Sequence, residues 1–159
     1  GTSETAKQHL QKTMSEINQA HPDVCAVISV NKGLVTQASA AIPVVPLYFA
    51  ILYKVMKKAG NHENCIQQIA RLFTQKLYTP TGFQTDENGF IRMDDYELAP
   101  EIQEEVKKCW KAVTTDTVKE YCDIDGYWED FYHMFGFRYE DIDYTQDVDA
   151  DIEIDGVVM

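Results

Sequence analysis

Apolar residues recur at helical spacing near the start of the chain, at Ala6, Leu10, Met14 and Ile17. The pattern predicts an amphipathic helix over residues 3–20, which His21-Pro22-Asp23 ends. The following run, Val24–Val30, is nearly all apolar and rich in β-branched residues, which predicts a buried strand of a parallel sheet. A helix followed by a buried strand is one half of an α/β unit.

A small, polar, glycine-containing segment, Asn31–Pro43, follows that strand. In open α/β sheets ligands bind at the carboxyl ends of strands, so this segment is a candidate ligand loop. An ordinary connecting loop has the same composition, and the residues alone leave both interpretations open.

The pattern then becomes helical. Pro46–Ala59 is apolar nearly all round, with Lys57 and Lys58 in its last turn and Gly60 as its C-cap. The next helix is expected to start at residue 61 or 62 and to reach about residue 78, with one apolar face that contains Ile66, Ile69, Ala70, Phe73 and Leu77.

Residues 79–95 are expected to form a loop or a hairpin around Asn88-Gly89. A helix opens at Pro100 and carries Ile102, Val106, Trp110 and Val113, with a Glu104–Lys108 pair on its surface. Shorter helices are predicted over about 116–122 and 126–135. Residues 138–159 form an acidic tail.

The fold class that follows is α/β: the edge of a parallel sheet, then a mostly helical region. The expected division is residues 1–45, 46–137 and 138–159. Because a lone buried strand needs partner strands, we expect an incomplete domain with exposed apolar area at Val24–Val30 and Pro46–Met56, and therefore self-association.

Charge is uneven along the chain. Residues 1–83 carry 8 Lys/Arg and 4 Asp/Glu, a net +4, whereas residues 84–159 carry 6 and 22, a net −16. The acidity argues against a nucleic-acid partner. The longest apolar run, Ala41–Tyr53, is 13 residues and too short to span a bilayer. Four widely spaced cysteines without a CxxC pair indicate reduced thiols in a cytoplasmic protein.

No metal site is expected. The acidic run at Asp147, Asp149 and Asp151 lacks the glycine that a calcium loop needs at its sixth position, where Ile152 stands. His62 and Cys65 have no further ligand pair and are interpreted as a surface histidine and a core cysteine. The aromatic cluster at Tyr127, Trp128, Phe131, Tyr132 and Phe135 forms either core or the lining of an acyl pocket.

Several stretches of the sequence are specific to one family. The longest is VNKGLVTQASAAIPVVPLY over Val30–Tyr48, and further stretches are LYKVMK, GNHENCIQ, IRMDDYEL, VTT, DGYWEDF, FGF and DYTQDVD. Together they cover nearly the whole chain and resemble the trans-2-enoyl-CoA reductases, which include the FabV-type enoyl-ACP reductases.

The resemblance implies the C-terminal portion of a longer enzyme with a Rossmann-type NADH domain of the short-chain-reductase kind. It implies reduction of an enoyl-CoA or enoyl-ACP thioester in fatty acid synthesis, without a metal. A non-catalytic truncated product that acts as an interaction module is the alternative.

The resemblance also assigns residues. The catalytic lysine falls on Lys7, which also holds the nicotinamide ribose, and its tyrosine partner falls upstream of Gly1. This chain has Glu4-Thr5-Ala6-Lys7 where the family usually has Gly-Lys-Ala-Lys, so a second cationic role there lacks support. The cofactor loop comprises Leu34, Val35, Thr36, Gln37, Ala38 and Ser39. The acyl pocket is expected to contain Leu34, Val35, Tyr53 and Tyr127.

Overall fold

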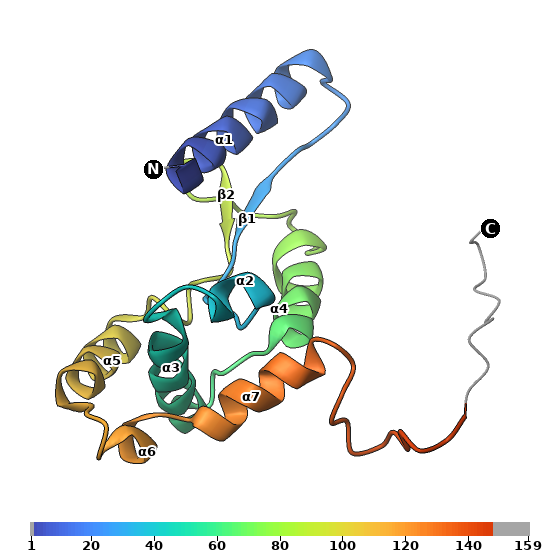
Figure 1. Cartoon of the computed structure of the whole chain (residues 1–159). Helices are drawn as coiled ribbons and strands as arrows, with labels where there is room; N and C mark the ends of the chain where they lie inside the picture. Colours follow the sequence, from blue (N-terminus) through green and yellow to red (C-terminus); the bar gives the residue numbers. More distant parts are fainter. Residues whose placement is uncertain (1, 148–159) are drawn as a thin grey trace.

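A computed structural model describes residues 2–147, apart from the side chains of residues 2 and 3. Asp149 and Asp151 of the acidic run lie outside the described residues. Figure 1 shows the elements in order: α1 (Thr2–Ala20), β1 (Ile28–Val30), α2 (Gln37–Ala40), α3 (Val45–Ala59), α4 (Cys65–Arg71), the π-helix η1 (Leu72–Leu77), β2 (Phe90–Arg92), α5 (Pro100–Ala112), α6 (Val118–Tyr121) and α7 (Ile124–His133).

The described sheet has two parallel strands. Ile28 pairs with Phe90 and Val30 with Arg92. The first strand is shorter than the predicted Val24–Val30 and only half-buried, and Val24 is 48% exposed. β2 is also three residues long and, among the described residues, pairs with residues 28–30 alone. The small parallel sheet and the larger number of helices agree with a partial α/β fold.

The segment before β2 is a loop rather than a hairpin. Asn88-Gly89 does form a turn, because the Gly89 N–H donates to the Asp86 carbonyl at 3.0 Å. The turn leads into a strand that pairs with distant β1 and not with a neighbour in sequence. Of the predicted range 79–95, residues 79–89 form a loop, whereas residues 90–92 form β2.

The hydrophobic core surrounds α3. Pro46 stands in its first turn and Gly60 ends it in the left-handed conformation, with φ 76°. Helices α5 and α7 pack against α3 and add Ile102, Val106 and Tyr127 to the core. Ile51, Leu52 and Met56 are completely buried, so the prediction of exposed apolar area over Pro46–Met56 was wrong: α5 and α7 cover that helix.

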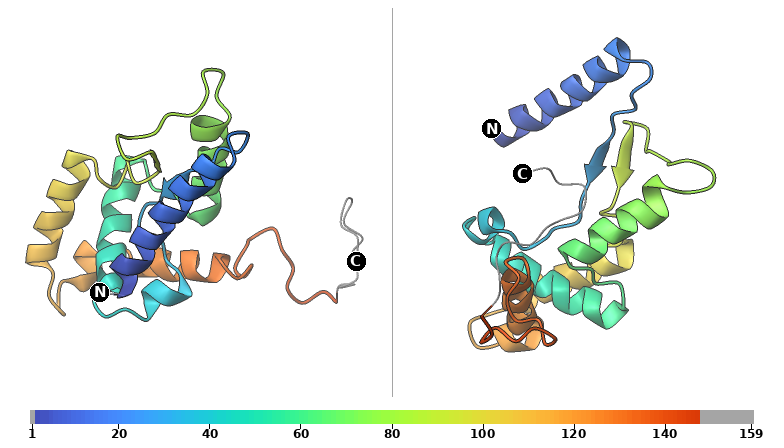
Figure 2. Two further views of the ribbon diagram at one scale, coloured as in Figure 1. Left: turned by 90° about the horizontal axis from the view of Figure 1, so that it is seen from above. Right: turned by 90° about the vertical axis from the view of Figure 1, so that its right-hand side faces the viewer.

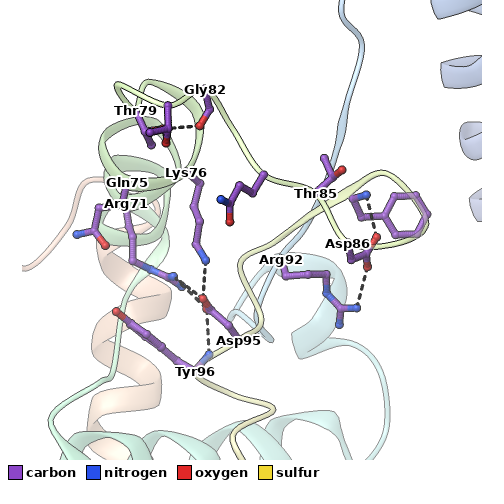
Figure 3. A pocket seen from close by; sticks show the side chains of 13 residues that line it. Arg71, Gln75, Lys76, Thr79, Gly82, Thr85, Asp86, Arg92, Asp95 and Tyr96 are labelled. Carbon is purple, nitrogen blue, oxygen red and sulfur yellow. Dashed lines mark hydrogen bonds and ion pairs between the residues drawn. The ribbon is translucent and has the colours of Figure 1, made fainter.

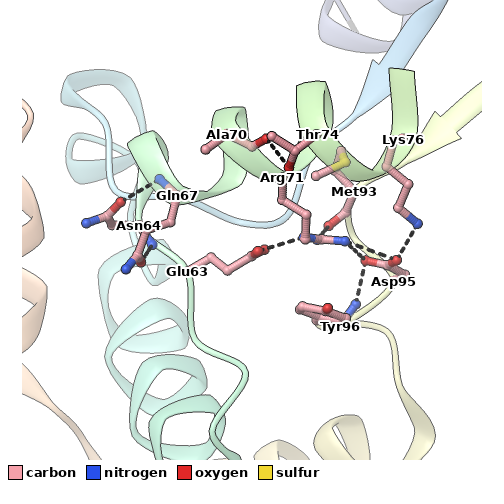
Figure 4. A network of polar contacts seen from close by, with 10 residues as sticks. All are labelled: Glu63, Asn64, Gln67, Ala70, Arg71, Thr74, Lys76, Met93, Asp95 and Tyr96. Carbon is pink, nitrogen blue, oxygen red and sulfur yellow. Dashed lines mark hydrogen bonds and ion pairs between the residues drawn. The ribbon is translucent and has the colours of Figure 1, made fainter. Parts of the chain in front are cut away.

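Helix α4 faces the core with its polar side. Gln68 and Arg71 are buried, while Ile66, Ile69 and Phe73 are 66%, 49% and 44% exposed. The Arg71 guanidinium donates to Glu63 Oε1 at 2.6 Å, to Asp95 Oδ1 at 3.0 Å and to the Met93 carbonyl at 2.8 Å (Figure 4). These charge-assisted bonds fix the helix with its polar side inward. The predicted apolar face of α4 and η1 is therefore an exposed surface.

Helix α1 stands apart from the helical assembly and is joined to it through β1 (Figures 1 and 2). The Asn18 side chain holds it to the strand lead-in, because Asn18 accepts from the Ala26 N–H at 2.7 Å and donates to the Ala26 carbonyl at 2.9 Å. None of the helices in the described residues is long and apolar enough to cross a membrane.

Candidate functional site

The loop between β1 and α2 is held by side chains at both backbone groups of Gly33. The Gly33 N–H donates to Glu97 Oε2 at 2.5 Å, and the Gly33 carbonyl accepts from Lys32 Nζ at 3.3 Å. The other Glu97 oxygen accepts from the Tyr48 hydroxyl at 2.6 Å. Glu97 therefore links Gly33 of the loop to Tyr48 of α3.

Only glycine fits at position 33. A Cβ built there would lie 2.6 Å from Phe49 Cε1 and 3.4 Å from Glu97 Oε2. Real Cβ atoms do not approach a ring so closely, and Phe49 is itself buried in the core. The backbone of the loop thus lies directly against α3.

The next residues of the loop are fixed as well. The Val35 N–H donates to the Tyr53 hydroxyl oxygen at 3.0 Å. Thr36 caps α2 through a capping box with Ser39, and the Ser39 hydroxyl also donates to the Leu34 carbonyl at 3.1 Å. Thr36, Gln37 and Ala38 remain exposed. Contacts on its inner side therefore fix the backbone of the loop, while its solvent-facing side is free to contact a ligand.

A cavity of about 90 Å³ lies beside this loop. It brings together three of the predicted site residues, Leu34, Val35 and Tyr53. The rest of its lining comes from α4 and from α7 with the segment after it: Asn64, Cys65, Ile66, Asp130, His133, Met134 and Tyr139. The lining is mostly apolar and has a few polar groups.

Several polar groups are buried around this cavity. Lys32 is 2% exposed, and burial lowers its pKa to about 8. Its Nζ lies 4.9 Å from the centroid of the Tyr53 ring. His62 Nε2 lies 3.3 Å from Asp130 Oδ2, and the His62 side chain is only 11% exposed. The interpretation of His62 as a surface histidine was therefore wrong, because α7 covers it.

Tyr53 is completely buried, and burial raises the pKa of its phenol, so the hydroxyl stays protonated. Its oxygen accepts from Val35, and its hydrogen has no acceptor among the described residues. Tyr53 therefore offers a neutral donor at the cavity.

Two predicted residues lie away from the cavity. Tyr127 is buried in the core on α7 and is not among the lining residues, although its side chain influences the pKa of Tyr53. Lys7 is exposed on α1, which stands apart from the loop (Figure 2). In the described part of the chain no three His, Cys, Asp or Glu residues form a group that could hold a metal ion.

A larger cavity of about 590 Å³ lies at the far end of η1, between the loop after it and β2 (Figure 3). Its cations are already paired: Lys76 Nζ with Asp95 Oδ2 at 2.7 Å, and Arg92 with Asp86 at 3.3 Å. Because each positive charge has a carboxylate partner, this cavity does not favour an anion.

Comparisons with known proteins agree with the sequence motifs. Residues 1–78 match a family model described as the trans-2-enoyl-CoA reductase catalytic region, and residues 85–148 match one described as the enoyl reductase FAD binding domain. The chain is 45% identical to an enoyl-[acyl-carrier-protein] reductase [NADH] of Flavobacterium psychrophilum and 45% identical to a trans-2-enoyl-CoA reductase [NADH] of Ruminiclostridium cellulolyticum, with 99% of this chain and 40% of each relative covered.

The fold is similar to that of a solved relative. The trans-2-enoyl-CoA reductase of Treponema denticola, in complex with NAD, superposes with a TM-score of 0.86 at 46% identity. The comparison covers 93% of this chain and 37% of that one. The chain thus spans about two fifths of the length of the relatives that it matches.

The described residues of the second matched region do not form the Rossmann-type turn that holds a dinucleotide pyrophosphate. A dinucleotide pyrophosphate is bound where a strand turns through glycines into a helix. In the described part of residues 85–148, Gly89 precedes a strand, Gly126 lies inside α7 and Gly136 follows it. No step is therefore assigned to a flavin.

Glu97 had no assigned role at the level of sequence, although it lies in the IRMDDYEL stretch. Its partner Gly33 is 64 residues away, a separation that no local pattern reveals. The motifs, the two matched regions, the identities near 45% and the shared fold lead to one conclusion: the chain belongs to the trans-2-enoyl-CoA reductase family.

Proposed function

We propose that this chain forms part of an NADH-dependent reductase that reduces the C2–C3 double bond of trans-2-enoyl thioesters in fatty acid synthesis. The thioester carrier is CoA or acyl carrier protein, and relatives with either name are equally similar to this chain. The Rossmann-type sheet, the division at residues 45 and 137 and a cytoplasmic location belong to the same proposal.

One observation carries the proposal: the exposed loop and the apolar cavity share Leu34 and Val35. A cofactor bound against the outer side of residues 34–39 and an acyl group in the cavity would therefore meet at these two residues. The loop follows a parallel strand at its carboxyl end, where α/β folds bind cofactors.

NADH bound at this loop would supply a hydride for Cβ of the thioester, which would leave negative charge on the thioester oxygen. In this chain the Tyr53 hydroxyl is a neutral donor at the cavity, which suits a hydrogen bond to a developing oxyanion. Lys7 is proposed to hold the nicotinamide ribose and to lower the pKa of the acid tyrosine outside this chain. Tyr127 is proposed to contact the acyl chain from the core side of α7.

Steady-state oxidation of NADH by crotonyl-CoA, in the complete protein that contains this chain, tests the proposal. We expect turnover that depends on both substrates. Folded protein that neither binds NADH nor reduces an enoyl thioester would refute it. That result would favour the alternative of a non-catalytic interaction module.

A further inference from the structure

Glu97 joins three parts of the fold that are far apart in the sequence. It follows β2, and its two carboxylate oxygens accept from Gly33 in the loop and from Tyr48 in the first turns of α3. The Gln103 side chain on α5 binds the Glu97 backbone carbonyl at 2.7 Å. Glu97 is therefore held on both its side chain and its backbone.

Both carboxylate oxygens of Glu97 accept a hydrogen bond at this position. Glu97 is 8% exposed, so each oxygen needs its partner. Burial and the hydrogen bond to Glu97 raise the pKa of Tyr48 to about 12, so Tyr48 remains a donor over the physiological range. Lys32, on the other side of Gly33, adds a favourable charge interaction with Glu97.

Bonds from the Gly33 N–H to a carboxylate are charge-assisted and about twice as strong as neutral ones. Gly33 directly precedes Leu34 and Val35, and the Phe49 ring lies where a side chain at position 33 would stand. Removing the Glu97 carboxylate would therefore release the Gly33 N–H, and with it the backbone of the residues proposed to contact the cofactor.

We propose that Glu97 is a positioning residue for the nicotinamide end of NADH, acting through Gly33 on the backbone of residues 34–36. The proposal rests on the proposed function, because it requires that this loop take the nicotinamide. It also gives the second matched region, residues 85–148, a role in NADH binding through a contact that no flavin requires.

The test compares NADH with ADP-ribose, which has the same adenosine, phosphates and ribose but no nicotinamide. Dissociation constants for both are measured by titration calorimetry on the complete protein, as wild type, Glu97→Gln and Glu97→Ala. Glu101→Gln, which changes an exposed acid in the first turn of α5, is the matched control. Circular dichroism and thermal unfolding confirm that each variant is folded.

We expect NADH to bind about threefold more weakly to Glu97→Gln and about tenfold or more to Glu97→Ala, with ADP-ribose unchanged. Glu101→Gln should bind both ligands as wild type does. Equal weakening of both ligands, or no weakening of either, overturns the positioning role.

If neither Glu97 variant folds, Tyr48→Phe carries the same test, because it releases the carboxylate without touching the loop. The expected result is again selective loss of NADH affinity, and an unchanged NADH affinity overturns the proposal. Wild-type protein that binds no NADH is a different result and refutes the proposed function.

Discussion

Replacing Lys32 by methionine should stabilise the fold at neutral pH. Lys32 is 2% exposed, and its ammonium makes one long hydrogen bond, 3.3 Å to the Gly33 carbonyl. Burial lowers its pKa from 10.5 to about 8, against the opposing influence of Glu97, Asp130 and Glu63. The charged form is therefore poorly accommodated in the folded chain.

The magnitude follows from the pKa. A difference of about 2.5 between 10.5 and about 8, at about 1.4 kcal/mol for each pKa unit, amounts to about 3 kcal/mol. Methionine has a similar volume and carries no charge. It gives up the long hydrogen bond and the contact with the Tyr53 ring, together worth about 1 kcal/mol. Lys32→Met should therefore raise the free energy of unfolding by about 2 kcal/mol near pH 7.

The stability difference between wild type and Lys32→Met should depend on pH in a defined direction. Because the pKa of Lys32 is lower in the folded chain, the unfolded chain binds more protons between about pH 8 and 10.5, so wild-type stability gains from this group as pH rises through that window. The advantage of Lys32→Met should be full below pH 8 and should shrink above it.

Urea unfolding of the 159-residue chain, followed by the fluorescence of Trp110 and Trp128, measures this at about pH 7 and pH 9.5. Lys107→Met, at an exposed position of α5, is the control and should change stability by less than about 0.5 kcal/mol. A Lys32→Met chain that is less stable than wild type at both pH values would show that the buried charge is better accommodated than its surroundings indicate.

Three further outcomes are expected. In the complete enzyme, Lys7→Ala should lower kcat/KM at least about 100-fold, as the loss of an acid–base group does. Lys12→Ala, on the same helix, is the control, and its kcat/KM should stay within about threefold of wild type. Equal effects of the two substitutions would show that Lys7 is not the catalytic lysine. Gly33→Ala should lower stability by about 1–3 kcal/mol in thermal unfolding because its Cβ meets Phe49, and an unchanged Tm would refute the close approach. The isolated chain should reduce no crotonyl-CoA and should self-associate in light scattering through the apolar face of α4 and η1; a monomer at high concentration contradicts this.

Local signals predicted the helices well where the ends are marked by specific residues. The predicted Pro46–Ala59 and the observed Val45–Ala59 differ by one residue, because proline and glycine act on the backbone itself. The prediction of a Glu104–Lys108 ion pair was wrong, since Lys108 Nζ lies 3.1 Å from Glu105 Oε2 instead. Surface pairs depend on side-chain rotamers that a spacing rule does not specify.

Other features depend on contacts that a pattern of residue types cannot reveal. Periodicity located the apolar residues of α4 on one face but not the direction of that face, which is decided by the partners of Arg71. With three residues, β2 is too short to be recognised as a strand from the sequence. The family motifs placed Leu34, Val35 and Tyr53 together, while the link from Glu97 to Gly33 became visible only in the fold.

The separation of 64 residues between Gly33 and Glu97 has a consequence for how the chain folds. Closing so long a loop costs chain entropy before any contact forms, which slows folding. During synthesis from the N-terminus, β1 and its following loop leave the ribosome well before β2 and Glu97 do. Until then β1 is not paired with β2, and the Gly33 N–H has no carboxylate to donate to. The Glu97 bond that holds the loop therefore forms only after the whole of α3, α4, η1 and β2 has been synthesised.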